Sequence, residues 1–162
     1  MLKPSKKVAL AFEAVVDIAY HGGAEPVQSQ DIARRLGLPR RYLEQVLQQL
    51  VRCGVLKGVR GPRGGYRLAR ERRRITVGEV VRVLEGAADE SNGNGSGSGA
   101  GSEDHTPAST SPLGLRVIGP FWERVSHEIM ERLDGLTIED LCREAEGQAI
   151  ASEARSGADF VI

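Results

Sequence analysis

The stretch RRYLEQVLQQLVRCGVLKGVRGPRGGYRLARE, residues 40–71, decides the fold. Pro39 stands directly before it and suits the first position of a helix, where a missing backbone N–H costs nothing. The apolar residues that follow recur at helical spacing, which predicts a helix over 39–53. One face of this helix carries Leu43, Val46, Leu47 and Leu50. The other face carries Arg40, Arg41, Glu44, Gln45 and Gln48.

Two further helices are expected before this stretch. Apolar residues at helical spacing predict a helix over 5–20, and HGGAEP at 21–26 ends it. A short helix over 29–36 stops at Gly37, which suits the left-handed conformation common after a helix. A helix, a tight turn and a second helix with a polar face form the helix-turn-helix pattern.

A basic hairpin is expected after the helix-turn-helix. GVLKGV at 54–59 and GYRLA at 65–69 flank RGPRG, which predicts two short strands around a Gly/Pro turn. Together these elements form a winged helix-turn-helix, whose second helix can enter the major groove of DNA. Gly61, Gly64 and Gly65 would let the backbone of the wing approach the duplex closely.

The polar face of the 39–53 helix carries side chains that can read bases. Glu44 can accept a hydrogen bond from a cytosine amino group, and Gln45 or Gln48 can pair with adenine. Arg40 or Arg41 can read guanine or hold a phosphate. A carboxylate on a surface that faces DNA is unfavourable unless it reads a base donor, which makes Glu44 the most informative of these residues.

The basic charge is concentrated around the predicted wing. The chain has 22 Lys plus Arg and 22 Asp plus Glu, yet residues 59–74 hold seven arginines. Residues 1–75 carry 16 basic and six acidic residues, and residues 76–162 carry six and 16. A basic half indicates a polyanionic partner. We expect Arg60 and Arg63 at the minor groove or its phosphates, and backbone contacts from Arg67, Arg70 and Arg72 to Arg74.

The second half predicts a linker between two helical parts. Thr76 and Glu79 form a capping box before a helix that ends at Gly86. Residues 91–102 hold five glycines and four serines, which is typical of a flexible linker, here taken as 87–112. A helix of about 22 residues, roughly 33 Å long, follows Pro112. Its apolar residues at three-four spacing are Leu115, Ile118, Trp122, Val125, Ile129 and Leu133. Thr137 and Asp140 begin a last short helix.

The stretch quoted first, together with ITVGEVVRVLEG at 75–86, resembles the bacterial Rrf2 family of winged helix-turn-helix repressors. The resemblance covers residues 3–86 closely and 113–145 by pattern. It implies a homodimer in which the 113–134 helix crosses its twin, so that the six apolar residues above become the dimer interface. It also implies a palindromic operator on double-stranded DNA, with the family's recognition glutamate at Glu44 and its wing arginine at Arg60.

The chain departs from the family at the cofactor site. Many members bind an iron–sulfur cluster through three cysteines between the fourth helix and the dimer helix. Residues 87–112 contain no cysteine, and Cys53 and Cys142 do not match the ligand positions. A cluster needs thiolates or an equivalent ligand set, so we expect no cofactor and no metal. A redox-responsive or iron–sulfur-responsive regulator stays open as an alternative.

The C-terminal tail, 146–162, ends in Asp159, Phe160, Val161 and Ile162. This ending resembles the tail of serine acetyltransferase, whose terminal isoleucine carboxylate docks in cysteine synthase. The family's cysteine-metabolism repressor lacks a cluster and works with cysteine synthase. The two resemblances imply a regulator of cysteine metabolism that docks its tail in cysteine synthase. Two alternatives are an interaction protein with degenerate DNA binding and a tail that packs on its own domain.

The expected fold class is mainly α with a small β wing: a winged helix-turn-helix domain over 1–86 plus a long dimerisation helix and short helix over 113–145. No nucleophile, base and orienting residue group together, so we expect no enzyme activity. No window approaches the roughly 20 apolar residues that cross a bilayer. We therefore expect a cytoplasmic repressor of transcription.

Overall fold

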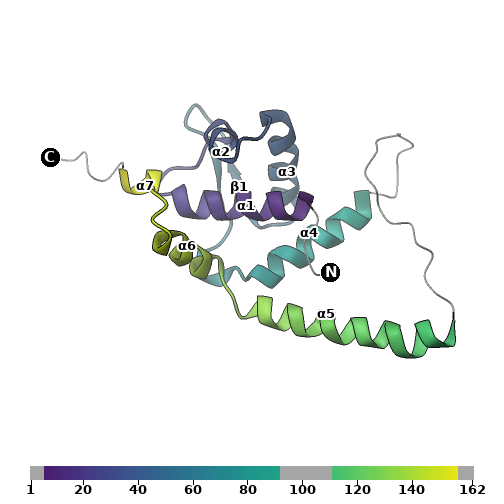
Figure 1. Ribbon diagram of the computed structural model, residues 1–162. Helices are drawn as coiled ribbons and strands as arrows, with labels where there is room; N and C mark the ends of the chain where they lie inside the picture. The colour runs from purple at the N-terminus through teal and green to yellow at the C-terminus, as the bar shows by residue number, and fades with distance from the viewer. Residues whose placement is uncertain (1–5, 92–110, 157–162) are drawn as a thin grey trace.

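The structure, a computed structural model, describes residues 6–91 and 111–156 and confirms the expected fold class (Figure 1). Its elements are α1 (Lys6–His21), α2 (Ser29–Leu36), α3 (Arg40–Arg52), β1 (Leu56–Val59), β2 (Gly65–Leu68), the 3-10 turn η1 (Arg72–Arg74), α4 (Val77–Ser91), the π-helical turn η2 (Gly114–Ile118), α5 (Gly119–Asp134), α6 (Ile138–Gly147) and α7 (Glu153–Ser156). None of the helices in these two ranges is long and apolar enough to span a membrane.

The core surrounds α1, which runs across the middle of the molecule (Figure 1). The largest fully buried side chains include Ile18, Ile32, Leu43, Leu47, Leu50, Ile75 and Ile138. Each fully buried aliphatic side chain contributes about 1.5–3 kcal/mol to folding. Ile138 and Cys142 of α6 belong to this core, so the last short helix packs on the same α1 that supports the helix-turn-helix.

The helix-turn-helix is confirmed, with a shift at its turn. Gly37 has φ 64° and ends α2, as predicted. The 39–53 helix begins one residue later than predicted, because Pro39 has an extended ψ of 128° and is the residue that caps α3. Its carbonyl accepts hydrogen bonds from the Tyr42 and Leu43 amides, both at 3.1 Å. A proline ring fixes φ near the helical value and leaves ψ free, so it fits this cap position as well.

The predicted helices of the second half differ from the structure in two places. α4 continues through Gly86 to Ser91, because one exposed glycine costs a helix only about 1 kcal/mol. The helix predicted from 113 begins as the π turn η2, in which the Gly119 amide bonds to the Gly114 carbonyl. Pro120 has no N–H to donate to the carbonyl four residues earlier, and the backbone widens just before it.

The two predicted caps have different outcomes. The Thr137 cap is confirmed as a full capping box with Asp140. At Thr76 the hydroxyl accepts from the Glu79 amide at 3.1 Å, but the Glu79 carboxylate lies against Arg70. The second half of the predicted Thr76 box is therefore replaced by an ion pair to the end of the wing.

The wing is attached to the body through Val27. In the β1–β2 hairpin Leu56 lies opposite Leu68 and Val59 lies opposite Gly65. Val27 and Tyr66 exchange two backbone hydrogen bonds of 2.8 Å each, so the loop before α2 adds a third, one-residue strand. The wing is therefore held to the loop before α2 as well as to α3.

Two wing glycines are required by these contacts. A Cβ on Gly65 would overlap the carbonyl oxygen of Val27, and a Cβ on Gly64 would overlap that of Val59. Gly61 has φ 118°, which side chains rarely adopt. The glycines predicted to let DNA approach are thus also required by the fold, because they allow the turn to close and the wing to pack against the loop that contains Val27.

Replacing Gly65 by alanine should destabilise the protein, because the new Cβ meets backbone that cannot move away. We expect a loss of about 1–3 kcal/mol in the free energy of unfolding, measured by urea denaturation. Gly58→Ala in β1 is the matched control, since nothing lies within 4 Å of a Cβ there. That control should leave stability unchanged or raise it by up to about 1 kcal/mol. Equal stability of the two variants would contradict the tight contact at Val27.

Candidate nucleic-acid interface

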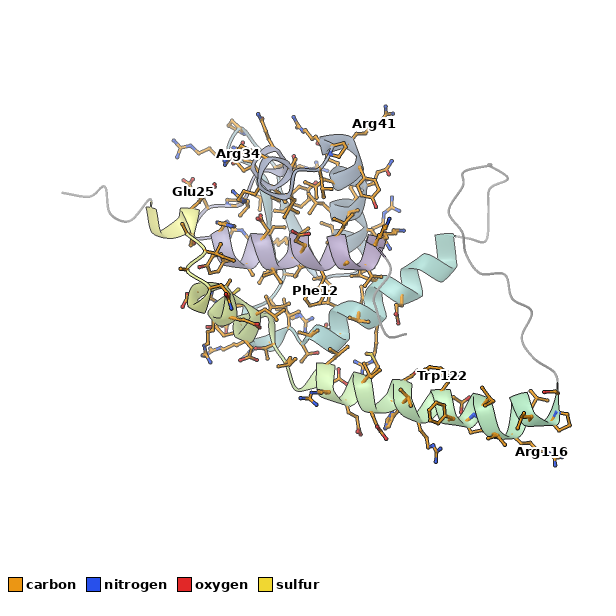
Figure 2. The ribbon with its side chains drawn as sticks, in the orientation of Figure 1. Phe12, Glu25, Arg34, Arg41, Arg116 and Trp122 are labelled. Atoms are coloured by element: carbon orange, nitrogen blue, oxygen red, sulfur yellow. The ribbon has the colours of Figure 1, made fainter. Side chains whose placement is uncertain are left out.

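The polar face of α3 is exposed as predicted. Arg40, Arg41, Gln45 and Gln48 are exposed and Glu44 is half-buried, while Leu43, Val46, Leu47 and Leu50 are buried on the opposite face. Arg41 lies at the end of α3 farthest from α5 (Figure 2). The spacing of apolar residues predicts which face of α3 is buried, because an amphipathic helix packs its apolar face against the core.

Glu44 is held by a neighbour on its own helix. Its carboxylate accepts a hydrogen bond from Arg40 Nε at 2.9 Å, one helical turn earlier. Burial raises the pKa of the Tyr66 hydroxyl, and the Glu44 carboxylate adds to that rise. The charge of Glu44 therefore acts on the wing residue Tyr66, and one of its acceptor oxygens is shared with Arg40 before any base is present.

A hollow of about 520 Å³ lies where α2, α3 and the wing meet. Its lining comprises Gln28, Ser29, Gln30, Arg40, Gly58, Val59, Arg60, Gly61, Pro62, Gly64, Gly65 and Tyr66. The hollow joins the N-terminus of α2 to Arg40 and Arg60. Backbone N–H groups at a helix start and arginine side chains are the donors that contact a DNA backbone.

The residues at the start of α2 were not predicted from the sequence. Gln28 has an extended backbone and caps α2, and Ser29 and Gln30 form its first turn. A polar run, QSQD, before a short amphipathic helix is a recognisable helix start. That signal predicts a cap, but only the fold places the cap beside the wing.

Most arginines of the wing region already have partners in the same chain. Arg63 lies 3.4 Å from a Glu25 oxygen, and Arg67 donates to the Ala24 carbonyl at 3.3 Å. Arg70 pairs with Glu79, Arg72 with Glu139 and Arg73 with Glu71. The backbone contacts expected from Arg70 and from Arg72 and Arg73 therefore compete with internal ion pairs, whose partners the sequence alone does not indicate.

A few cations at the interface keep no acidic partner. Within residues 6–91 and 111–156, Arg41, Lys57 and Arg60 have no carboxylate within 4 Å. All three are exposed, and they lie on α3, β1 and the wing turn. Unpaired, exposed cations are the ones that release counterions when they meet phosphate.

Comparison with known proteins shows which family the chain resembles. The family model Rrf2, described as an iron-dependent transcriptional regulator, matches residues 4–144. The HTH-type transcriptional regulator CymR of Bacillus subtilis (strain 168) is 31% identical over 147 residues, which covers 91% of this chain and 94% of CymR. A solved structure of T. potens IscR is 37% identical with a TM-score of 0.67 and covers 93% of both chains. The structure of B. subtilis CymR, described as the global cysteine regulator, is 31% identical with a TM-score of 0.64 over 89% of this chain and 98% of CymR.

The residues of this chain do not fit a cysteine-ligated iron–sulfur cluster. Cys53 follows α3 and is half-buried, whereas Cys142 is buried in α6, and burial raises the pKa of its thiol. No group of three or more His, Cys, Asp or Glu side chains that could hold a metal occurs in the part of the chain that the structure describes. Residues 87–112 contain no cysteine.

The family assignment rests on the whole domain and not on the cofactor. The match extends from the first helix into α6, and it includes the helix-turn-helix, the wing and the long helix. The relatives at this similarity are transcriptional regulators and not enzymes. This chain belongs to the Rrf2 family of transcriptional regulators.

Proposed function

We propose that this regulator is a homodimeric repressor that reads a palindromic DNA operator with α3 and the wing. The observation that carries the proposal is the hollow between the start of α2, Arg40 and the wing. Arg60 lines it and Arg41 is exposed on α3, and neither has an acidic partner among the described residues. A DNA backbone seated there would bring the exposed side of α3 to the base edges in the major groove.

Specificity and affinity come from different residues in this arrangement. Gln45 and Gln48 are exposed on α3 with two donors and an acceptor each, and Glu44 keeps one carboxylate oxygen beyond Arg40. These groups match the edges of adenine and cytosine. Arg41 and Arg60 have no acidic partner to lose in the described residues, so their contacts with phosphate add to affinity for any sequence.

Substituting Glu44 and Arg60 should separate these two contributions. An operator is first selected from random duplexes, and affinities are then measured over a range of salt concentrations. Glu44→Ala should reduce discrimination at one operator position by about 1–3 kcal/mol and change the salt slope little. Arg60→Ala should weaken binding to all sequences and lower the slope by about 0.9 for each phosphate that is no longer neutralised. Unaltered base preference in Glu44→Ala would refute the reading role of Glu44.

The dimer is proposed from the apolar side of α5 and η2. Leu115, Ile118 and Trp122 are 63%, 47% and 45% exposed, whereas Ile129 and Leu133 are half-buried. Trp122 and Arg116 lie on the half of this long helix that extends away from α1, α2 and α3 (Figure 2). An uncovered apolar stripe of this kind favours association with a second surface.

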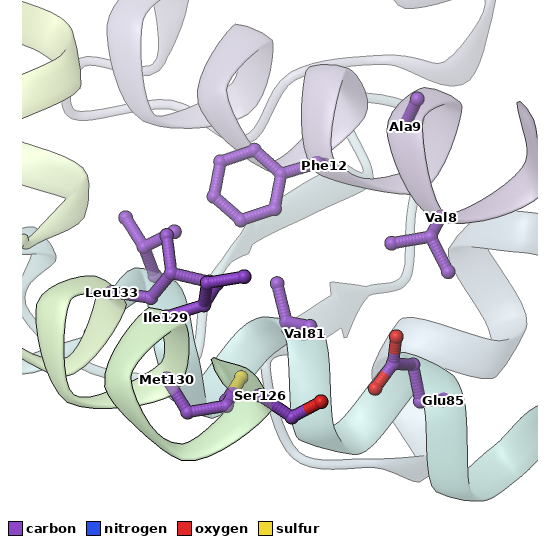
Figure 3. A pocket seen from close by; sticks show the side chains of 10 residues that line it. Val8, Ala9, Phe12, Val81, Glu85, Ser126, Ile129, Met130 and Leu133 are labelled. Carbon is purple, nitrogen blue, oxygen red and sulfur yellow. The ribbon is translucent and has the colours of Figure 1, made fainter. Parts of the chain in front are cut away.

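The other half of α5 forms one wall of an apolar hollow of about 370 Å³ (Figure 3). α1 contributes Val8, Ala9 and Phe12, α4 contributes Val77, Val81 and Glu85, and α5 contributes Ser126, Ile129, Met130 and Leu133. Each chain thus has an exposed apolar half-helix and an apolar hollow next to it. Two copies related by a twofold axis can bury both features reciprocally.

The spacing of the stripe indicates where that axis lies. An axis that crosses α5 between Val125 and Ser126 places two antiparallel copies in register with each other. Trp122 then lies opposite Ile129, and Ile118 lies opposite Leu133. The apolar stripe is therefore complementary to itself, and the exposed half of each copy meets the hollow of the other.

Engineered cysteines next to this axis test the dimer. Val125→Cys should form a disulfide-linked dimer under mild oxidation, because the two copies of residue 125 face each other near the axis. Arg124→Cys is the control, since residue 124 has nearly the same height along the helix but points to a different side. If the protein is a dimer in solution but residue 125 does not cross-link, the twofold axis lies elsewhere on α5. If the protein is a monomer, the proposed dimer is refuted.

We infer that the regulated genes belong to cysteine or sulfur metabolism. The support is the similarity to CymR, which is described as the global cysteine regulator of B. subtilis. Docking in cysteine synthase would use Asp159, Phe160, Val161 and Ile162, which lie outside the residues that the structure describes. Capture of a C-terminal carboxylate is a known mode of peptide recognition.

Deleting Ile162 tests that docking directly. Binding of the purified regulator to cysteine synthase should be lost on deletion, because the terminal carboxylate is displaced by one residue and the isoleucine side chain is removed. Isothermal titration calorimetry with both forms gives the comparison. Equal binding of both forms, or none by either, would refute docking and leave a DNA-binding regulator with a different signal.

A further inference from the structure

The C-terminal segment 150–153 is bound to the end of α1 by hydrogen bonds in both directions. The Tyr20 hydroxyl donates to the Ile150 carbonyl at 2.6 Å, and the buried Ser152 hydroxyl donates to the Tyr20 carbonyl at 2.8 Å. The last carbonyls of a helix have no partner inside the helix, so Ser152 supplies one that α1 lacks. These contacts join residues 130 and 132 positions apart.

His21 adds a third contact to this segment. Its Nδ1 accepts a hydrogen bond from the Glu153 amide at 3.1 Å. Burial lowers the pKa of His21 below its usual value, against the opposite effect of Asp17. A lowered pKa favours the neutral ring, in which Nδ1 is available as an acceptor.

Glu153 then connects the segment to α2. Its carboxylate lies 2.9 Å from Arg34 Nη2 and 2.5 Å from Arg35 Nη1. Arg35 also donates two hydrogen bonds to Asp17, at 2.9 and 2.8 Å, and these two side chains are only 12% and 6% exposed. The C-terminal half of α2 is thus held between α1 and the short helix α7.

The opposite end of α2 belongs to the proposed DNA interface. Gln28, Ser29 and Gln30 line the hollow beside the wing. α2 has only eight residues, roughly 12 Å, and buries only Ile32 and Ala33. Leu36 also packs, partly buried, against the core. The ion pairs at Arg34 and Arg35 add a polar constraint on how this short helix is oriented. A tilt at that end displaces the end that faces the hollow.

We propose that the segment Ile150–Glu153 is a clasp that positions α2 for DNA binding, with Glu153 as its positioning residue. The proposal rests on the DNA-binding function proposed above for the surface of α2, α3 and the wing. In this proposal the segment that follows α6 affects DNA affinity, although it contacts the end of α2 that is farther from the hollow.

Charge alone predicts the opposite effect of removing Glu153. Loss of one carboxylate, with two arginines released, would strengthen binding to a polyanion. Loss of the clasp would weaken it, because α2 no longer holds the hollow open for the backbone. The sign of the change in affinity therefore separates a positioning role from a general electrostatic one.

Three variants of the full chain test the clasp. Glu153→Ala removes it, and Glu153→Gln keeps an acceptor for Arg34 and should restore part of the effect. Glu144→Ala on α6 is the matched control, because it removes the same charge from an exposed residue with no ion pair among the described residues. The readouts are affinity for the selected operator and hydrogen exchange at the α2 amides.

We expect Glu153→Ala to bind the operator at least about fivefold more weakly than wild type, with faster exchange in α2. Glu144→Ala should bind equally or slightly more tightly, with α2 exchange unchanged. The clasp is refuted if Glu153→Ala binds as tightly as Glu144→Ala, or if its α2 amides stay protected. If wild type selects no operator, the proposed function fails, and hydrogen exchange still decides whether Glu153 holds α2.

Discussion

The ion pair between Asp17 and Arg35 is the interaction on which the arrangement of the DNA-binding surface depends. It fastens α2 to α1 with two hydrogen bonds in a nearly buried site. Removing one member of such a pair leaves an uncompensated charge and costs about 3–5 kcal/mol. α2 is short, and in the proposal above this polar attachment, extended by Glu153, adds to its apolar packing in setting how α2 meets the wing.

The parts of the fold that the sequence predicts are those with local causes. The inner face of α3, the left-handed Gly37 and the hairpin around RGPRG follow from residues within one or two turns of each other. The structure differs where a local signal is weak. Gly86 does not end α4, since a glycine in an exposed helix position costs only about 1 kcal/mol.

The sequence predicts which residues of α3 are exposed at the candidate site, but not which side chains contact one another there. Periodicity places Glu44, Gln45 and Gln48 on the outer face of α3, and the structure agrees. It does not show that Arg40 already holds Glu44, or that α2 contributes the third side of the hollow. The Glu153 contacts with α2 join residues 119 and 118 positions apart, and no period or motif in a single sequence relates positions at that distance.

The zero net charge of the chain is consistent with DNA binding once the pairs are known. Acidic residues of the second half reach back and neutralise arginines of the first: Glu79 pairs with Arg70, Glu139 with Arg72, and Glu153 with Arg34 and Arg35. These pairs lie where the wing and α2 join the body. Arg41 and Arg60, on the surfaces that face outward from α3 and the wing, keep no acidic partner among the described residues.

The net charge of this chain therefore does not indicate the electrostatic potential at its proposed DNA-binding surface. Three carboxylates of the second half, those of Glu79, Glu139 and Glu153, pair with arginines of the basic half, so the charge at its surface differs from the charge counted along the chain. A count of charges along the sequence does not separate arginines that have an acidic partner within the chain from those that have none. The three-dimensional pairing makes that distinction for the described residues.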